Sequence, residues 1–196
     1  HTKFNLKSDQ EPAILALKES VKVACKAECI IFEESPVGES QSNGEIEGVV
    51  KLVKGQVRTM RLSLETRYKT KIDPDHHIVP WMVNEAAKSI NRYQVGFDGK
   101  TRRERLKGKK FSRETAEFGE CVFYLVLKTK GRYSWEERWS EGIWLGIREE
   151  SGEIIIGTRE GVVKARSFKR KPEQDRWDRE WLDNFQGVPW EPVPER

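Results

Sequence analysis

The chain has 196 residues, and 35% of them carry a charge. Its 36 basic and 32 acidic side chains leave a net charge of +4, and the length suits one large domain or two small ones. Apolar runs extend over only a few residues, whereas a membrane-spanning helix needs roughly 20, so no membrane association is predicted. The three cysteines, Cys25, Cys29 and Cys121, form neither a disulfide framework nor a zinc-binding pattern and favour a reducing, intracellular compartment.

Positive charge is concentrated in the middle of the chain. Residues 1–50 hold five Lys and Arg against nine Asp and Glu, whereas residues 51–110 hold sixteen against six. The remaining residues, 111–196, are close to balance, with fifteen basic and seventeen acidic side chains. A polyanion is therefore expected to bind the middle of the chain.

The first elements predicted are a helix, a strand and a polar loop. Pro12 is a typical first residue of a helix, and Ala13, Ile14, Leu17 and Val21 follow at helical spacing. Residues 27–32 read as a short strand, and residues 33–44 are rich in turn-forming and polar residues. Asp9 is thus expected where a strand or loop meets a helix.

A long amphipathic helix is predicted to begin near Gly44. Its apolar stripe, expected to be buried, comprises Val49, Val53, Val57, Met60 and Leu64. A second stripe at the same spacing comprises Glu47, Lys51, Lys54, Arg58 and Arg61, so a carboxylate comes first and four cations follow. Spacing alone explains this stripe equally well as an ordinary solvated helix face.

The segment after this helix contains a break, another helix and a basic run. Residues 73–75, Asp-Pro-Asp, end the pattern, and a helix is predicted from about Ile78 to Arg92. His76 and His77 lack a matching pair of ligands and are not expected to bind metal. The basic residues at 100–110 predict a linker or a second surface that contacts phosphate.

Beyond Phe111 the apolar pattern becomes that of short strands. Strands are predicted at 121–127, 142–147, 153–157 and 161–166, which together suggest a small barrel or sandwich. A basic edge is expected at Lys164, Arg166, Lys169, Arg170 and Lys171. In the tail, Trp177, Trp181 and Trp190 either pack on this β structure or anchor a partner, and packing is the favoured interpretation.

Asp9 and Glu47 are candidates for a divalent-metal site. Thirty-seven residues lie between them, on separate predicted elements. Mg²⁺ prefers carboxylate and water ligands, with few protein ligands from any one element, and it neutralises charge as a phosphodiester reacts. Two acidic residues at such spacing are common by chance, so this signal is weak alone.

The residues around both carboxylates resemble the catalytic motifs of retroviral and retrotransposon integrases. Residues 41–47, Gln-Ser-Asn-Gly-Glu-Ile-Glu, are similar to the family motif Gln-Ser-x-Gly-x-x-Glu, whose last glutamate binds metal. Residues 8–11, Ser-Asp-Gln-Glu, resemble the segment that carries the family's middle aspartate. The spacing between the two carboxylates is close to the family's usual one.

Further matches follow in the same chain order. Lys51 and Lys54 occupy positions that contact the DNA ends of the element in this family, and Ser42 and Asn43 match loop positions beside the DNA end. Residues 81–92 with 98–101 resemble the final helices and turn of the catalytic domain, although Arg102 replaces the usual proline. Parts of the segments at 118–122 and 142–146 resemble the small β domain that follows.

The resemblance implies a fold class and a division of the chain. It implies an α/β, partial ribonuclease-H-like integrase catalytic domain over 1–107, a small all-β, SH3-like barrel over 108–172, and a Trp- and Pro-rich charged tail over 173–196. The first aspartate of the catalytic triad would precede His1, and the family's amino-terminal zinc module is absent from this sequence. We therefore expect the carboxy-terminal part of an integrase from a Pol polyprotein, inactive alone.

The same resemblance implies the activity and the site. In the intact protein, Asp9 and Glu47 would bind Mg²⁺ or Mn²⁺ for 3′-end processing and strand transfer into target DNA. The implied partners are the element ends, the target DNA and further copies of the protein, with action in the nucleus. The expected DNA contacts are Ser42, Asn43, Lys51, Lys54, Arg58 and Arg61.

An alternative keeps the DNA binding without the catalysis. The chain would then be a decayed remnant or a domesticated interaction protein that retains the basic helix and the β domain. A ribonuclease H is a third hypothesis, but it does not explain a Gln-Ser-x-Gly loop that leads into a long basic helix.

Overall fold

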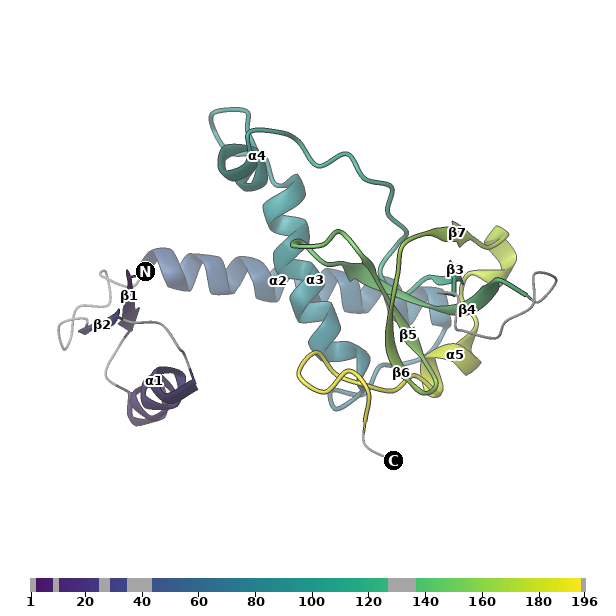
Figure 1. Ribbon diagram of the computed structural model, residues 1–196, viewed down its shortest axis with the longest axis horizontal. Coiled ribbons are helices and arrows are strands. Elements are labelled where there is room, and N and C mark those ends of the chain that lie inside the picture. Colours follow the sequence, from purple (N-terminus) through teal and green to yellow (C-terminus); the bar gives the residue numbers. More distant parts are fainter. Residues whose placement is uncertain (1–2, 9–10, 25–28, 35–43, 127–136, 195–196) are drawn as a thin grey trace. The chain divides into compact units, whose positions relative to one another are not determined.

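The computed structural model describes residues 3–8, 11–24, 29–34, 44–126 and 137–194. The chain divides into two compact units, His1–Leu52 and Val53–Arg196. The elements of both units are labelled in Figure 1.

The first unit contains two parallel strands joined through a helix. These elements are β1 (Lys3–Ser8), α1 (Pro12–Ala24) and β2 (Cys29–Glu34), with Lys3 opposite Cys29 and Ser8 opposite Glu34. Parallel pairing needs a long crossover, which α1 provides. The predicted helix start at Pro12 is confirmed, and the predicted strand lies two residues further along the chain.

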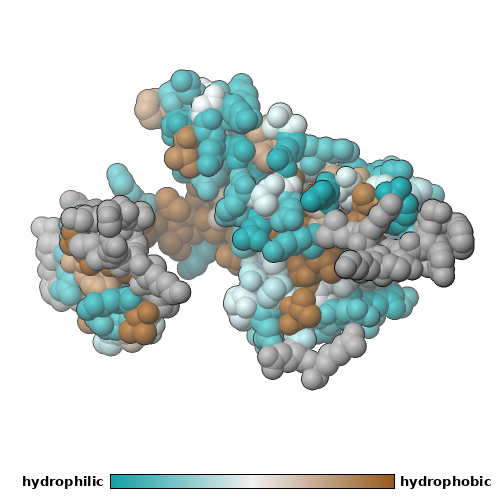
Figure 2. Space-filling view, viewed as in Figure 1, coloured by the Kyte–Doolittle hydropathy of each residue, from teal (hydrophilic) through white to brown (hydrophobic). Residues whose placement is uncertain are grey.

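Apolar side chains of the first unit remain largely exposed. Leu17, Val23 and Ile46 are 59%, 87% and 65% exposed, and Figure 2 shows hydrophobic patches on this unit. Among its described side chains, Lys18 is the one that is buried, with its Nζ 5.8 Å from the centre of the Phe32 ring and 3.5 Å from the carbonyl oxygen of Glu33. The described part of this unit therefore has little hydrophobic core.

The long helix α2 (Gly44–Tyr68) confirms the predicted start at Gly44. Its predicted apolar stripe is buried only in part. Leu64 is 2% exposed, and Val57 and Met60 pack against the same core. Val49, by contrast, is 47% exposed, which differs from the prediction. The reason is that the helix meets the hydrophobic core of the second unit only in its carboxy-terminal half.

Two further helices follow in the second unit. In α3 (Ile78–Tyr93) the apolar residues Ile78, Met82, Ala86 and Ile90 recur every fourth position and are buried. The short helix α4 (Arg102–Lys107) begins within the basic run that the sequence left without structure. The Thr101 side chain accepts a hydrogen bond from the Glu104 amide, and Gly108 ends the helix with φ +71°, as a left-handed cap favours.

A five-stranded antiparallel sheet follows these helices in the second unit (Figure 1). The strand order is β6-β5-β4-β3-β7. The last strand in the chain, β7, therefore pairs with β3, the first strand of this sheet. Among the described residues, no pairing closes β6 onto β7, so the sheet is open. The strands are β3 (Cys121–Leu125), β4 (Trp139–Ile147), β5 (Ile154–Thr158), β6 (Gly161–Ala165) and β7 (Phe168–Arg170).

One hydrophobic core joins helices, sheet and tail. It includes Leu64 of α2, Trp81 of α3 and Leu145 of β4 together with Leu182 and Phe185 of the tail. A second cluster, around Trp144 and Ile156, lies within the sheet region. The tail contains a 3-10 turn (Glu173–Asp175) and α5 (Arg179–Asp183).

The tryptophans of the tail mostly take part in this packing. Trp177 and Trp181 are partly buried against the core, which confirms the packing prediction for these two side chains. Trp190 is 75% exposed. The Trp81 ring donates a hydrogen bond from Nε1 to the carbonyl oxygen of Gly187 at 3.0 Å, which fixes the end of the tail to α3. Within the described part of the chain, no helix has the length and apolar character needed to cross a membrane.

Candidate nucleic-acid interface

The two predicted metal ligands are placed only in part. Asp9 comes directly after β1 but lies outside the described residues, as do Ser42 and Asn43. Glu47 is exposed in the first turn of α2, where the helix dipole favours a negative charge. The described residues contain no group of three or more His, Cys, Asp or Glu side chains suited to hold a metal ion. The role of Asp9 and Glu47 therefore stays a prediction.

A row of cations follows Glu47 along one face of α2. Lys51, Lys54 and Arg58 succeed one another at intervals of three and four and are exposed, so they lie on the same side of the helix. None of the three forms a hydrogen bond or ion pair with another described residue. Positive charge at this spacing is mildly repulsive, by about 0.2–0.5 kcal/mol per pair.

The acidic residues that usually balance such a row are missing from this stretch. Between Glu47 and Glu65 the sequence contains no Asp or Glu. Other exposed cations of this chain do have such neighbours, for example Arg179, which pairs with Asp183 one turn away. The face formed by Lys51, Lys54 and Arg58 is here called the α2 cationic face, and beyond Glu47, one turn before Lys51, the described residues provide no carboxylate partner for it.

Arg61 continues the same spacing but has intramolecular partners. Its Nη2 donates to the carbonyl oxygen of Ile72 at 2.6 Å, and its Nε donates to Glu65 at 3.1 Å. Glu65 also accepts from the Ile72 amide at 3.2 Å and from Lys71 at 2.8 Å, and the Lys71 hydrogen bond is the main reason that the pKa of Glu65 is lowered. Arg61 thus holds the turn after α2, a role that spacing did not predict.

The predicted basic edge of the sheet divides in a similar way. Arg170 donates two hydrogen bonds to Glu120, at 2.8 and 2.7 Å, and Glu120 is completely buried. Lys171 is 9% exposed and donates to Glu141 at 2.8 Å. Lys169 lies over the Trp139 ring, 4.6 Å from its centre. Arg170 and Lys171 therefore stabilise the fold, while Lys169 stays at the surface.

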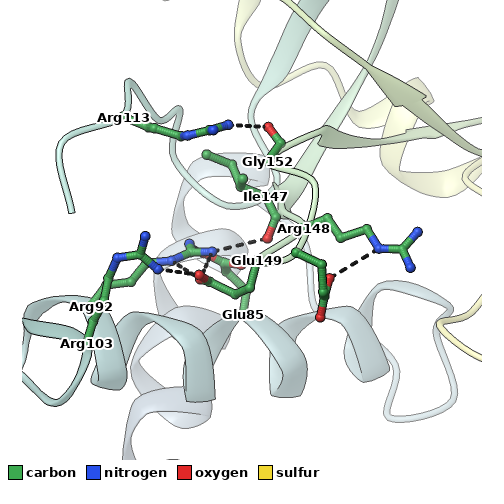
Figure 3. A network of polar contacts seen from close by, with 9 residues as sticks. Glu85, Arg92, Arg103, Arg113, Ile147, Arg148, Glu149 and Gly152 are labelled. Atoms are coloured by element: carbon green, nitrogen blue, oxygen red, sulfur yellow. Dashed lines mark hydrogen bonds and ion pairs between the residues drawn. The ribbon is translucent and has the colours of Figure 1, made fainter. Parts of the chain in front are cut away.

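A buried ion-pair network connects α3, α4 and the turn between β4 and β5 (Figure 3). Arg92, which is 2% exposed, donates from Nη1 to Glu85 at 2.8 Å and from Nε to Glu149 at 2.7 Å. Its Nη2 donates to the carbonyl oxygen of Ile147 at 3.1 Å. Arg103 donates to the other oxygen of Glu149. Figure 3 shows these side chains converging above α3.

The network contains one carboxylate in an unfavourable position. Glu85 is 4% exposed, and its Oε2 has no hydrogen-bond partner among the described residues. Burial raises the pKa of Glu85 to about 7, against the opposing effect of Arg92. The carboxylate lies against Gly146, where a Cβ atom would come within 2.4 Å of Oε2. Gly146 also has φ +136°, a conformation that side chains other than glycine rarely adopt, so glycine is favoured on β4 at this point.

Lys88 lies on α3 next to this network. It is half-buried and forms no hydrogen bond with a described residue. Burial lowers the pKa of Lys88, which the nearby carboxylate of Glu85 opposes. Lys88 was not among the residues predicted to form a site. Its only sequence signal is its place on α3 between Glu85 and Arg92, and the surrounding charges come from residues far along the chain.

Comparisons with known proteins include a weak structural similarity. No protein-family model matches the sequence. No curated protein matches it either. A chain in the cryoEM structure of the simian T-cell lymphotropic virus intasome in complex with PP2A regulatory subunit B56 gamma is structurally similar, with 15% identity and a TM-score of 0.37. The match covers 86% of this chain and 58% of that one, so this chain spans less than two thirds of its length. Similarity at this level leaves the function to be argued from the chain's own residues.

Proposed function

We propose that the chain binds DNA through the α2 cationic face, as part of an integrase of the retroviral and retrotransposon type. The observation that carries this proposal is the row Lys51, Lys54 and Arg58, exposed and without described ion-pair partners, directly after the 41–47 motif. Phosphates at successive positions along a nucleic-acid backbone would relieve the mutual repulsion of these cations and release counterions on binding. An ordinary solvated face would have acidic side chains among its cations, and none lies between Glu47 and Glu65.

In the intact protein, the proposed function includes Mg²⁺- or Mn²⁺-dependent 3′-end processing and strand transfer in the nucleus. The donor set fits such an ion, because Asp9 and Glu47 both offer carboxylate oxygens and Glu47 is exposed. A bound ion would supply charge neutralisation at the reacting phosphodiester. The first turn of α2 would position the Glu47 carboxylate, and the α2 cationic face would hold the DNA next to that carboxylate.

The fold proposed for this function has two parts. The parallel pair β1 and β2 with α1 is compatible with a piece of a ribonuclease-H-like sheet. The meander from β3 to β6, with β7 returning to β3, is compatible with an SH3-like barrel. Both assignments remain proposals, and the assembly with further copies of the protein is part of the same proposal.

The test of DNA binding replaces Lys51, Lys54 and Arg58 with Ala in the full chain. Fluorescence anisotropy with labelled duplex DNA should show weaker binding and a salt dependence flatter by up to about three units of log–log slope, since each lost phosphate contact removes roughly 0.9. The matched control replaces Arg105, Arg159 and Arg179, three exposed cations that already have carboxylate partners. Equal effects in both variants would contradict the proposal.

The catalytic part is tested by Glu47→Gln in a protein that contains this chain and a complete triad. We expect loss of metal-dependent strand transfer with DNA affinity largely retained. Retained strand transfer would remove Glu47 from the site. The alternative, a non-catalytic DNA-binding remnant or domesticated interaction protein, predicts DNA binding by this chain and no strand transfer in the protein that contains it.

A further inference from the structure

A groove on the second unit combines positive charge with a cavity. It lies between α3, α4 and the turn after β4, has a volume of about 360 Å³, and is lined by residues that include Lys88, Asn91, Arg102, Lys107 and Glu149. This volume is within the range of roughly 300–1,000 Å³ that is typical of small-molecule sites. We call it the α3–α4 groove. All of these residues belong to the second unit.

The acidic residues of the groove already have cationic partners. Glu149 lies between Arg92 and Arg103 in the buried network, and Glu150 pairs with Arg148 at 3.2 Å. In Figure 3 the side chain of Arg148 extends away from the cluster around Arg92. The carboxylates of the groove therefore pair with Arg92, Arg103 and Arg148, and they reach Lys88 only through longer-range electrostatic attraction.

The remaining cations are Lys88, Arg102 and Lys107. Lys107 and Lys88 form no hydrogen bond or ion pair with a described residue, and Arg102 donates only to the neutral Gln94, at 2.8 Å. Lys88 is half-buried, so its ammonium group has lost part of its hydration without gaining a partner, which is unfavourable unless an anion binds there. The amide of Asn91, exposed at the same groove, offers a further donor.

The positive surface continues beyond the groove. A second hollow of about 540 Å³ shares Lys88, Glu149 and Glu150 with it and reaches Lys164 on β6. Lys164 is exposed and has no described hydrogen-bond or ion-pair partner. Cations thus occur on both sides of Lys88, which suits an extended anion better than a single phosphate.

We infer that the α3–α4 groove binds two or more neighbouring phosphate groups of one polyanion, with Lys88 at the centre and Arg102 and Lys107 at one end. This site does not include the α2 cationic face and does not depend on it. The same phosphate chemistry occurs in a nucleic-acid backbone and in a free polyphosphate such as an inositol phosphate. The probes below distinguish the two sources.

The experiment uses the full chain with two probes, labelled duplex DNA in anisotropy and inositol hexakisphosphate in calorimetry. The variant Lys88→Gln with Lys107→Gln should weaken binding of at least one probe about tenfold or more, because charge-assisted hydrogen bonds are lost. The matched control is Lys22→Gln with Lys69→Gln, an equal loss of charge at exposed residues on α1 and directly after α2. The control should change either affinity by less than about twofold.

Each outcome decides the inference. A loss confined to DNA assigns the groove to nucleic acid, and a loss with inositol hexakisphosphate assigns it to a free polyphosphate. Failure of both probes to bind, or equal losses in variant and control, overturns the inference. The α2 variant described above should leave binding of inositol hexakisphosphate unchanged, so failure of the proposed function and failure of this inference are separate results.

A folding defect is the remaining explanation that must be removed. Because Lys88 is half-buried, its replacement can lower stability, so thermal melts compare the variants with the unchanged chain. If Lys88→Gln lowers the melting temperature, Arg102→Gln with Lys107→Gln changes only exposed side chains of the same groove and should weaken binding of the same probe. Unchanged binding in that variant overturns the inference.

Discussion

The two units of the chain bury their apolar residues to very different extents. In the second unit Ile78, Ile143 and Ile156 are completely buried. In the described part of the first unit, Leu17 and Val23 are 59% and 87% exposed. A two-stranded sheet without an apolar core has little stability of its own. Most of the stability of the chain is therefore expected to come from the second unit.

This difference also separates the functional residues. The predicted metal ligands Asp9 and Glu47 belong to the first unit, whereas the α3–α4 groove belongs to the second. The α2 cationic face begins at Lys51, in the first unit, and continues through Lys54 and Arg58 in the second.

The largest expected effect is in the core of the second unit. Leu145 is 1% exposed in β4, so Leu145→Ala should lower the free energy of unfolding by about 2–5 kcal/mol. Leu17→Ala, in α1, should change it by less than about 0.5 kcal/mol. Denaturant titration followed by circular dichroism measures both. Equal effects would show that the first unit has a core that the described residues do not reveal.

A smaller effect is expected from a buried ion pair. Glu120→Gln removes the charge that Arg170 binds through two hydrogen bonds, and should cost roughly 2–4 kcal/mol, less than for a fully buried pair because the Arg170 side chain is 35% exposed. The comparison is Glu33→Gln, whose ion pair with Lys7 at 4.0 Å is exposed. That change should leave stability within about 0.5 kcal/mol. A large effect at Glu33 would contradict the contrast between the units.

A pH-dependent effect is expected from Glu85. Because burial raises its pKa from 4.5 to about 7, the folded state retains a proton that the unfolded state releases between these values. The stability that the protonated Glu85 side chain contributes is fully present below pH 4.5 and is lost as the pH rises through 7. Glu85→Gln removes this titration, so the free energy of unfolding should fall by roughly 1–3 kcal/mol less between these two pH values than in the unchanged chain.

The control for this prediction is Glu19→Gln, which removes an exposed carboxylate of α1. Thermal melts between pH 4 and 8 measure both variants against the unchanged chain. Other titrating groups, such as His76, whose pKa burial lowers, are common to all three proteins and cancel in the comparison. An unchanged pH profile in Glu85→Gln would show that the buried network does not hold a proton.

Local signals allowed much of the secondary structure to be predicted. Pro12 and Gly44 marked the starts of α1 and α2, and helical spacing placed α3 to within one residue. For α4, Thr101 and Gly108 were available as capping signals, but its six residues are nearly all charged and show no apolar periodicity. The strand β7 was missed because its three residues are held by pairing with β3, more than forty positions earlier in the chain.

The sites were predictable where one element provides all of the side chains. The row Lys51, Lys54 and Arg58 could be read from spacing on α2, and the structure adds that its members are exposed. For the α3–α4 groove, the sequence indicated only the basic run 100–110, which contains Lys107, because Lys88 lies on α3 and Glu149 after β4. Tertiary contacts alone decide which carboxylates are neutralised there.

Lysine reactivity in the presence and absence of duplex DNA tests the central claim most directly, because it needs no substitution. Lys51 and Lys54 are exposed on the α2 cationic face, and Lys22 is an exposed reference lysine on α1. With DNA present at low salt, the amine-reactive label should be excluded from Lys51 and Lys54 while Lys22 remains reactive, and high salt should restore the labelling. Unchanged labelling of Lys51 and Lys54 by a chain that binds DNA would contradict the account.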